Sequence, residues 1–302
     1  MTANTIEDSF EQPIQPRSSE EIFFDNGFKI VATTLAIAIC LLIIWIILQV
    51  LTQAFPAIGE FGLGFLFSSQ WDPVRNSFGL WPSIFGTLVS SALAMLIAVP
   101  IGIGVAIFLS EDYIPPGIQR VFVFLVELLA AIPSVVYGLW GLFVLVPFLR
   151  PVGVTRASML PAVIILSIMI LPMISAISRD ALSNVSKDMR QAAIGLGATR
   201  WETILQIVIP AASSGIIGGI MLALGRALGE TMAIVMLIGN SNQVSFSLLQ
   251  PATTISALIA NQFAEAQGLQ VSALMYAAFV LSVITLIVNI LAQVVVKQLQ
   301  KI

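Results

Sequence analysis

Six long apolar runs constrain the fold of this chain more than any other feature of its sequence. Each has about 18 residues or more, which is enough to cross the hydrocarbon core of a bilayer as a helix. A helix also satisfies its own backbone hydrogen bonds, as a segment surrounded by lipid must. The runs cover residues 30–51, 83–109, 121–149, 159–177, 208–238 and 271–296. The sequence therefore predicts an all-α membrane protein with six transmembrane helices.

The composition agrees with a polytopic membrane protein. Of the 302 residues, 58% are hydrophobic and 10% are charged, and the mean hydropathy is +1.00. Soluble domains carry about 25% charged residues. Several runs are longer than one perpendicular crossing, so we expect tilting, or breaks at Pro100, Pro133 and Pro147, to take up the excess.

The residue inventory excludes several classes of function. The chain has no histidine and one cysteine, Cys40, which excludes disulfides, histidine-based metal sites and histidine-dependent triads. None of its lysines follows the glycine spacing of a P-loop, so we expect no ATP binding by this chain itself. The net charge of −3 argues against nucleic acid as a partner. We expect no catalytic residue, no metal and no cofactor, and we look for the function in the membrane.

The basic residues predict the orientation of the spans. With the N-terminus inside, nine lysines and arginines fall on the cytoplasmic side and three fall outside. This distribution satisfies the positive-inside rule and places both termini in the cytoplasm. Residues 1–28, with six acids and one arginine, are expected to form a solvated cytoplasmic tail. Residues 29–82 would then hold the first span and an external loop, and residues 83–302 the rest of the transmembrane domain.

A second external loop, residues 239–270, contains the stretch TISALIANQFAEA. We expect this stretch to form a short helix that lies at the surface or is partly re-entrant. Long loops of this kind could dock an external partner, or they could be solvated connectors.

The internal loop at about 188–212 has a different character and reads DMRQAAIGLGATRWETILQIVIPAA. We expect a short helix, a tight bend permitted by Gly195 and Gly197, and a second helix over 201–210. Small side chains at Ala192 and Ala193 would let this helix–turn–helix sit in the groove of a partner. A solvated connector is the alternative interpretation.

This loop resembles the coupling-loop signature of ABC importer permeases, which reads Glu-Ala-Ala, three residues, Gly, nine residues, and Ile-x-Leu-Pro. Gln191 stands where the family usually has glutamate, and Ile209 where it usually has leucine. The positions that the resemblance assigns to coupling with an ATPase are Gln191, Ala192, Ala193, Gly197, Ile207 and Pro210.

Three further stretches are similar to the phosphate-specific importer permeases: WDPVRNSFGLWPSIFGTL, ELLAAIPSVVYGLWGLF and ALGRALGETMA. The first favours the PstC type over the PstA type. The resemblance runs from about residue 20 to the C-terminus. It implies the type I ABC importer (MetI-like) permease fold and a permease subunit of an ATP-driven phosphate importer, located in a bacterial inner membrane.

The same resemblance implies a set of partners. They are a homologous PstA-type permease, two copies of a PstB-type ATPase that binds the ATP, an external PstS-type phosphate-binding protein, and membrane lipid. Phosphate uptake needs such an energy source, because each negative charge moved inward works against about 2.3 kcal/mol per 100 mV of inside-negative potential.

Two rival functions remain open from the sequence. The first is a permease of the same superfamily for another oxyanion or small solute, since selectivity resides largely in the external binding protein. The second is a secondary transporter or channel that works without ATP. The coupling-like loop and the lack of an intramembrane series of proton-relay residues both argue against this second rival.

Two charges, Arg226 and Glu230, lie within the fifth apolar run. Four residues apart in a helix, they would share a face and pair. Pairing would offset part of the about 2.5–3.5 kcal/mol that a lone arginine costs at the bilayer centre. The pair could fix packing between two permeases. Alternatively, Arg226 could offer its donors transiently to phosphate while Glu230 prevents permanent capture.

Other polar residues of the third run are candidates for the same pathway. Ser134 and Tyr137 follow Pro133, which frees backbone carbonyls, and they could line the path or serve packing. Glu127 is expected to reach toward the interface or to bond a neighbouring helix.

Overall fold

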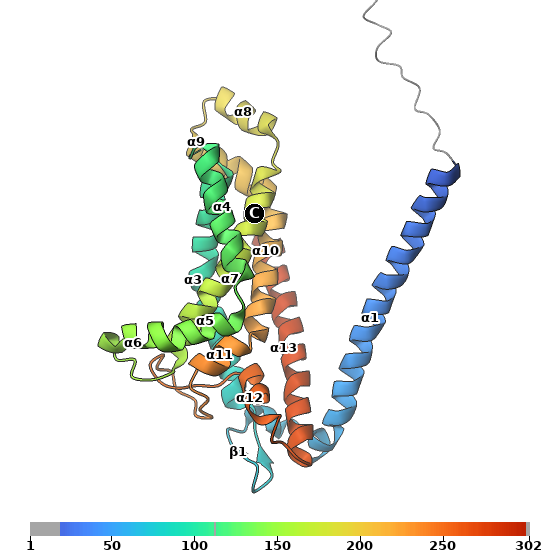
Figure 1. Ribbon diagram of the computed structural model, residues 1–302, viewed down its shortest axis with the longest axis vertical. Helices are drawn as coiled ribbons and strands as arrows, with labels where there is room; N and C mark the ends of the chain where they lie inside the picture. The colour runs from blue at the N-terminus through green and yellow to red at the C-terminus, as the bar shows by residue number, and fades with distance from the viewer. Residues whose placement is uncertain (1–18, 112, 300–302) are drawn as a thin grey trace, which may run out of the picture. The chain divides into compact units, whose positions relative to one another are not determined.

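The computed structural model describes residues 19–111 and 113–299, most of which are helical (Figure 1). The elements in chain order are α1 (Ser19–Phe61), α2 (Gly64–Phe67), β1 (Trp71–Asp72), β2 (Ser77–Phe78), α3 (Trp81–Ser110), α4 (Pro116–Ala131), α5 (Ser134–Trp140), the π-helical turn η2 (Gly141–Leu145), α6 (Val146–Phe148), the 3-10 turn η3 (Arg150–Val152), α7 (Met159–Ser183), α8 (Lys187–Gly195), α9 (Arg200–Thr203), the π-helical turn η4 (Ile204–Val208), α10 (Ile209–Gly229), α11 (Met232–Leu237), α12 (Ile255–Gln262) and α13 (Leu269–Leu299). The strands β1 and β2 form one antiparallel hairpin.

The chain divides into two compact units, with the boundary after Gln49 inside α1. In the first unit the helix carries large exposed apolar side chains along its length, as a lipid-facing span requires. Helix α1 begins at Ser19, so residues 19–28, which we expected in the solvated tail, are helical. The rest of the expected tail, residues 1–18, lies outside the described residues.

Five described helices are long and apolar enough to cross a membrane, and a bent helix pair forms a sixth candidate. The five are Asp25–Phe61, Trp81–Ser110, Met159–Ser183, Arg200–Gly229 and Leu269–Val294. They confirm the predicted all-α membrane fold, although most helices extend beyond the apolar runs from which they were predicted.

The predicted run 121–149 is not one straight helix. Helix α4 ends at Ala131, α5 begins at Ser134, and the two are bent by 92°. Proline has no N–H and collides with the preceding turn, so the predicted break at Pro133 is confirmed. The chain stays helical at Pro100, inside α3, and at Pro147, inside α6.

The predicted run 208–238 is also interrupted, and here the expectation of one helix through both charges is wrong. Helix α10 ends at Gly229, and Glu230 has an extended backbone with φ −64° and ψ 127°. Glycine favours the end of a helix because of its conformational freedom. The carbonyl of Glu230 accepts a hydrogen bond from the Ser256 hydroxyl at 2.8 Å, in place of a helical partner.

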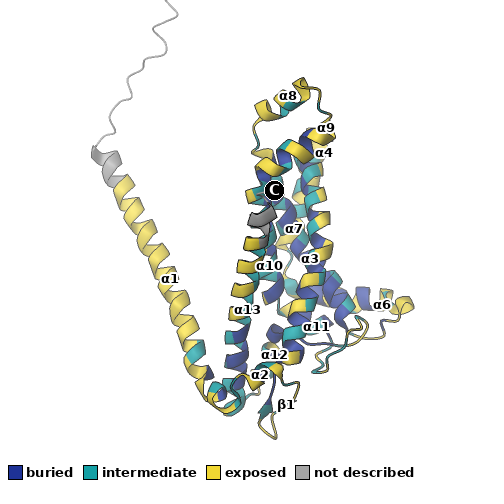
Figure 2. Ribbon diagram, turned by 180° about the vertical axis from the view of Figure 1, so that it is seen from behind, coloured by how far each residue is buried: buried dark blue, intermediate teal, exposed yellow. Residues whose placement is uncertain are grey.

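Helix α7 lies at the centre of the second unit and packs against α3 and α10 (Figure 2). Small residues bring these helices close together. A Cβ atom at Gly102 of α3 would lie 2.9 Å from the Ile174 side chain, and one at Gly215 of α10 would overlap Ala181. In a membrane, where lipid is as apolar as the helix surface, such close packing is a main source of helix association.

The two ends of the second unit carry different elements (Figure 1). Helices α8 and α9 lie at one end, which we call the α8 end, and the β1–β2 hairpin and α12 lie at the other, which we call the α12 end. Helix α12 confirms the short helix predicted in TISALIANQFAEA, and its first four residues, 255–258, are buried in the protein. The α12 end is therefore packed into the helices rather than laid over them.

At the α12 end, α3 is tied to the segment that leads into α12. The N–H of Ile255 donates to Thr87 Oγ1 at 3.0 Å. One residue earlier on α3, Gly86 lies directly against the backbone of Thr253, so that a Cβ atom at Gly86 would overlap the Thr253 carbonyl oxygen. Glycine at this position permits the contact.

We expect Gly86→Ala to destabilise the protein, because the added methyl group forces α3 away from Thr253. Overpacking of this kind costs about 1–3 kcal/mol, which should lower the midpoint of thermal unfolding in detergent by a few degrees. Gly104→Ala on the same helix is the control. It meets open space and gains helix propensity of about 1 kcal/mol. Equal unfolding midpoints for the two variants would contradict the close contact at Gly86.

Candidate functional site at the interrupted helices

The two interrupted helices meet in the structure, because α5 packs against α11. A Cβ atom at Gly138 of α5 would lie 2.8 Å from Met236 Sδ and 3.2 Å from the Cα atom of Ala233. The lack of a side chain at Gly138 thus lets the two helices touch. The break after α4 and the break after α10 are brought into one region of the protein.

Tyr137 crosses the bend between α4 and α5. Its hydroxyl donates to the Leu129 carbonyl at 2.8 Å. In an uninterrupted helix that carbonyl would bond the N–H of residue 133, which proline lacks. Ile132 reaches the same carbonyl only at 3.4 Å. The buried Tyr137 hydroxyl therefore replaces the missing helical donor, which is a structural role beyond the packing or path-lining roles predicted for it.

Arg226 lies in the last turn of α10 and is half-buried. Its Nε is buried without a hydrogen-bond partner. Because arginine keeps its charge in proteins, it cannot escape this environment by losing a proton. A buried donor that lacks an acceptor costs about 1–3 kcal/mol, and more when it is charged.

The predicted ion pair between Arg226 and Glu230 is wrong. Among the described residues, no ion pair within 4.0 Å joins them. The helix ends between them, so their spacing of four residues no longer places both side chains on one face. Glu230 Oε1 instead accepts from the N–H of Ala233, at 3.5 Å, in the first turn of α11. Glu230 thus makes a long hydrogen bond to the first turn of α11, and Arg226 keeps an unsatisfied donor.

The other polar residues of the third run differ in their contacts. Ser134 is half-buried at the start of α5, and among the described residues its side chain has no hydrogen bond to Tyr137, Arg226 or Glu230. Glu127 of α4 forms an ion pair with Arg179 of α7, with Oε1 and Nη1 3.6 Å apart. This confirms the expectation that Glu127 bonds a neighbouring helix.

The predicted coupling loop forms a helical hairpin at the α8 end. Helix α8 carries Gln191, Ala192 and Ala193, and the chain turns at Gly197 with φ +94°. Thr199 and Glu202 form a capping box that starts α9. The helix–turn–helix and the bend at Gly197 are as predicted, whereas Gly195, the other glycine expected in the bend, lies in α8.

We expected the second helix of the hairpin to end at Pro210, and this expectation is wrong. The chain continues from α9 through the π-helical turn η4, which contains Ile207, into α10, where Pro210 occupies the first turn. A proline is tolerated there because the η4 turn already departs from regular α-helical hydrogen bonding. Helical structure is therefore continuous from Arg200 to Gly229, and it joins the hairpin to the turn that carries Arg226.

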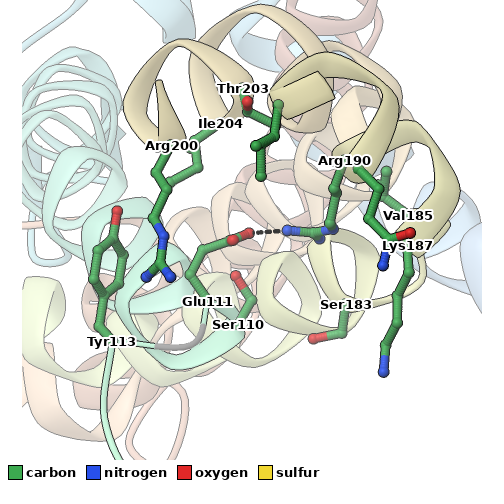
Figure 3. Close-up of a pocket in the computed structure, with 12 residues that line it drawn as sticks. Ser110, Glu111, Tyr113, Ser183, Val185, Lys187, Arg190, Arg200, Thr203 and Ile204 are labelled. Atoms are coloured by element: carbon green, nitrogen blue, oxygen red, sulfur yellow. Dashed lines mark hydrogen bonds and ion pairs between the residues drawn. The ribbon is translucent and has the colours of Figure 1, made fainter. Parts of the chain in front are cut away.

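A cavity of about 460 Å³ lies between α8, α9 and the ends of α3 and α7 (Figure 3). Arg190 of α8 pairs there with Glu111, and its Nη2 also donates to the Leu182 carbonyl at 2.7 Å. Our reading of the sequence missed this pair. Its members are 79 residues apart, so no helical or loop spacing could indicate the contact. An acid at the end of a span and an arginine beside the loop signature were the available signals.

We expect Tyr137→Phe to destabilise the bend, because the Leu129 carbonyl loses its best donor. An unsatisfied carbonyl shielded from water costs about 1–3 kcal/mol, and for this part-buried bond the loss should lower the thermal unfolding midpoint in detergent by a few degrees. Tyr113→Phe serves as the control, since Tyr113 is exposed at the α8 end. If both variants unfold at the wild-type temperature, the Tyr137 hydroxyl does not hold the bend.

Comparison with known proteins shows the family to which the chain belongs. The family model for the binding-protein-dependent transport system inner membrane component matches residues 98–301. The phosphate transport system permease protein PstC of Mesorhizobium japonicum is 44% identical over 289 residues, which cover 87% of each chain. The protein of the same name from Haemophilus influenzae is 39% identical over 302 residues, covering 93% of this chain and 96% of that protein.

Solved structures share the fold at low sequence identity. A chain of the bacterial alginate ABC transporter, in complex with its alginate-bound periplasmic protein, gives a TM-score of 0.63 at 20% identity and covers 92% of this chain and 96% of its own. A chain of the inward-facing MetNI methionine ABC transporter gives 0.56 at 17% identity, covering 75% and 95%. These likenesses confirm the predicted type I ABC importer (MetI-like) permease fold.

The relatives are named as permease proteins, which are transport components rather than enzymes. The family model covers more than half of the chain, and the PstC proteins match it over most of its length. The chain is a multi-pass membrane protein and belongs to the family of binding-protein-dependent transport system inner membrane components.

Proposed function

We propose that this chain is the permease subunit of an ATP-driven phosphate importer, in which it forms half of the translocation pathway and couples that pathway to a partner ATPase. The relatives named as PstC phosphate permeases support phosphate as the substrate. The observation that carries the pathway role is the buried, unpartnered Nε of Arg226 at the break after α10.

The environment of Arg226 suits transient contact with phosphate. A guanidinium presents a planar fork of donors that matches phosphate oxygens, and such charged hydrogen bonds are strong. Because Glu230 does not hold this fork, its donors are open to a passing anion. The Glu230 carboxylate still lies at the same break, and like charge limits how tightly an anion is retained. Tyr137, which bonds across the bend before α5, and Ser134 at the start of α5 complete the proposed pathway residues.

The hairpin at the α8 end suits contact with an ATPase. Leu196 and Trp201, at its tip, are 91% and 56% exposed. Gln191, Ala192 and Gly197 are also exposed, so the signature face is free of other parts of the described chain. Movement of the hairpin would pass directly along the continuous helix to Arg226.

The remaining partners follow from the family. A PstA-type permease would supply the other half of the pathway, and two copies of a PstB-type ATPase would supply ATP binding and hydrolysis. A PstS-type protein would deliver phosphate at the α12 end, in line with a family defined by dependence on a binding protein. The excess of basic residues on the α8 side supports an orientation in which the α8 end and both termini are cytoplasmic.

The rival functions make different predictions for a reconstituted complex of these subunits. A permease for another oxyanion or small solute would show ATPase activity stimulated by that solute rather than by phosphate. A secondary transporter would continue uptake after every ATPase partner is removed. Membership in the binding-protein-dependent family favours the ATP-driven function.

We expect Arg226→Gln to abolish phosphate uptake while the complex still assembles. Glutamine keeps much of the side-chain volume but loses the charge and the donor fork. Charged hydrogen bonds contribute about 1.5–3 kcal/mol each, so uptake should fall on the order of 100-fold. The measurement is ATP-dependent uptake of labelled phosphate into proteoliposomes, with the exposed Arg150→Gln as the control.

Two outcomes of this experiment would count against the pathway role. Normal uptake by correctly assembled Arg226→Gln complex would contradict it directly. Loss of assembly would instead support the alternative, in which Arg226 serves packing between the permeases.

We expect Gly197→Ala to weaken the contact with the ATPase. At φ +94° an alanine is strained by about 1–2 kcal/mol, so the turn between α8 and α9 should deform. The apparent affinity of the permease for the ATPase, measured by titration of the purified subunits in detergent, should fall about 5- to 30-fold. Gly195→Ala is the matched control, because Gly195 is helical and a Cβ there meets nothing within 4 Å. Equal affinities would show that the turn geometry does not matter for the contact.

A further inference from the structure

Helix α8 packs only lightly against its neighbours and makes polar contacts with α3 and α7. None of its residues is buried. The cavity of about 460 Å³ lies on one side of it (Figure 3). A second cavity, of about 560 Å³, is lined by Met189 of α8 and by residues of α7 and α10. An element with few buried contacts beside two cavities can shift, and its polar contacts then determine which neighbouring helices move with it.

Arg190 supplies these contacts. Its guanidinium pairs with Glu111, the residue that directly follows α3, and donates to the Leu182 carbonyl in α7. Both side chains of the pair are 18% exposed. An ion pair so shielded is screened less by water than a surface pair, and removing one partner leaves a poorly solvated charge.

Helix α3 connects this pair with the far end of the molecule. Its 30 residues form one uninterrupted helix, about 45 Å long at 1.5 Å per residue. Near its other end, Thr87 accepts the N–H of Ile255. The neighbouring Ser256 donates to the Glu230 carbonyl at the break beside Arg226. Contacts at the two ends of α3 thus lead from the hairpin to the candidate pathway site.

The hairpin is therefore connected to two long helices, α10 and α3, in different ways. It is continuous with α10 through α9 and η4, and it is joined to α3 through the Arg190–Glu111 pair. If the pair breaks, a displaced hairpin still carries α10, but α8 loses its direct polar contact with the end of α3, which then follows only through its packing against α7 and α10. The region around Arg226 and Glu230 includes the end of α10 and is contacted by α3 through the segment 253–256, so movement of either helix acts on it.

We infer that the Arg190–Glu111 ion pair is a coupling contact that transmits displacement of the α8–α9 hairpin to α3. Arg190 and Glu111 are positioning residues, since they act through α3 and touch no substrate. This inference rests on the proposed function, which supplies the ATPase that moves the hairpin. It adds a second line of transmission to the direct one through α10.

The test uses the complete complex of both permeases, the ATPase and the binding protein in proteoliposomes. Glu111→Gln removes the charge at nearly constant size. Two ratios are measured: the ATPase rate with phosphate-loaded binding protein over the basal rate, and phosphate taken up per ATP hydrolysed. We expect both to fall about tenfold, within the range of a single allosteric coupling contact. Basal ATPase activity and the amount of co-purified ATPase should stay at wild-type values.

Two matched variants control for simpler effects. Glu127→Gln makes the same chemical change in another ion pair between helices, the one with Arg179, which does not involve the hairpin. Lys187→Gln removes a charge from the lining of the same cavity, at the start of α8, without breaking the Arg190–Glu111 pair. Both should keep the wild-type ratios.

A double-mutant cycle decides whether the pair itself matters. If Arg190 acts through Glu111, then Glu111→Gln combined with Arg190→Gln should lose no more coupling than either single variant. Losses that multiply would overturn the inference. So would wild-type ratios in Glu111→Gln. Failure of Glu111→Gln to assemble, while Lys187→Gln assembles, would also overturn it, because the pair would then be a stability contact.

Failure of the proposed function would appear separately, in the wild-type complex. If phosphate-loaded binding protein neither stimulates ATPase activity nor drives uptake there, the substrate assignment fails whatever the variants do. The two coupling ratios can then be measured with the solute that does stimulate the complex, and the inference about Arg190 and Glu111 is tested in the same way.

Discussion

The structure depends on one constraint, which is that a helix interrupted inside a membrane must still satisfy its backbone hydrogen bonds. Two spans are interrupted here, and each break is served by a particular side chain. The Tyr137 hydroxyl bonds the Leu129 carbonyl that Pro133 leaves without a partner. The Ser256 hydroxyl bonds the carbonyl of Glu230. Each side chain supplies a donor that the interrupted helix no longer supplies, and so stabilises the chain at the place where it bends.

The same constraint explains the state of Arg226. An intact helix through Glu230 would have set the two charges on one face and neutralised both. The break turns Glu230 toward the start of α11, where its carboxylate accepts from Ala233. Arg226 is thus left with a buried donor and no acid to meet it. One half-buried guanidinium is therefore left without an anionic partner, and in the proposed function a passing phosphate would supply one.

Much of the fold followed from the sequence because hydropathy and proline act locally. Apolar runs indicated the spans, and the missing N–H of Pro133 indicated the bend. The break at Glu230 could not be predicted in this way, since no proline marks it and it depends on Ser256, 26 residues further along the chain. The link between Arg190 and Glu111 was hidden for a similar reason: only the folded arrangement of α3, α7 and α8 brings the two together.

The fifth span has a continuous helical part and a break after it, and this division bears on how movement could pass along the span. From Arg200 to Gly229 the chain is helical without a break, and a proline at position 210 is absorbed by the π-helical turn before it. A continuous helix transmits displacement along its axis, whereas an interrupted one can change direction at the break. Arg226 lies in the last turn of the continuous part. Under the proposed coupling function, displacement of the hairpin along this helix would act on the turn that carries Arg226. The break just beyond it, where the Glu230 carbonyl accepts from Ser256, is where the chain can change direction.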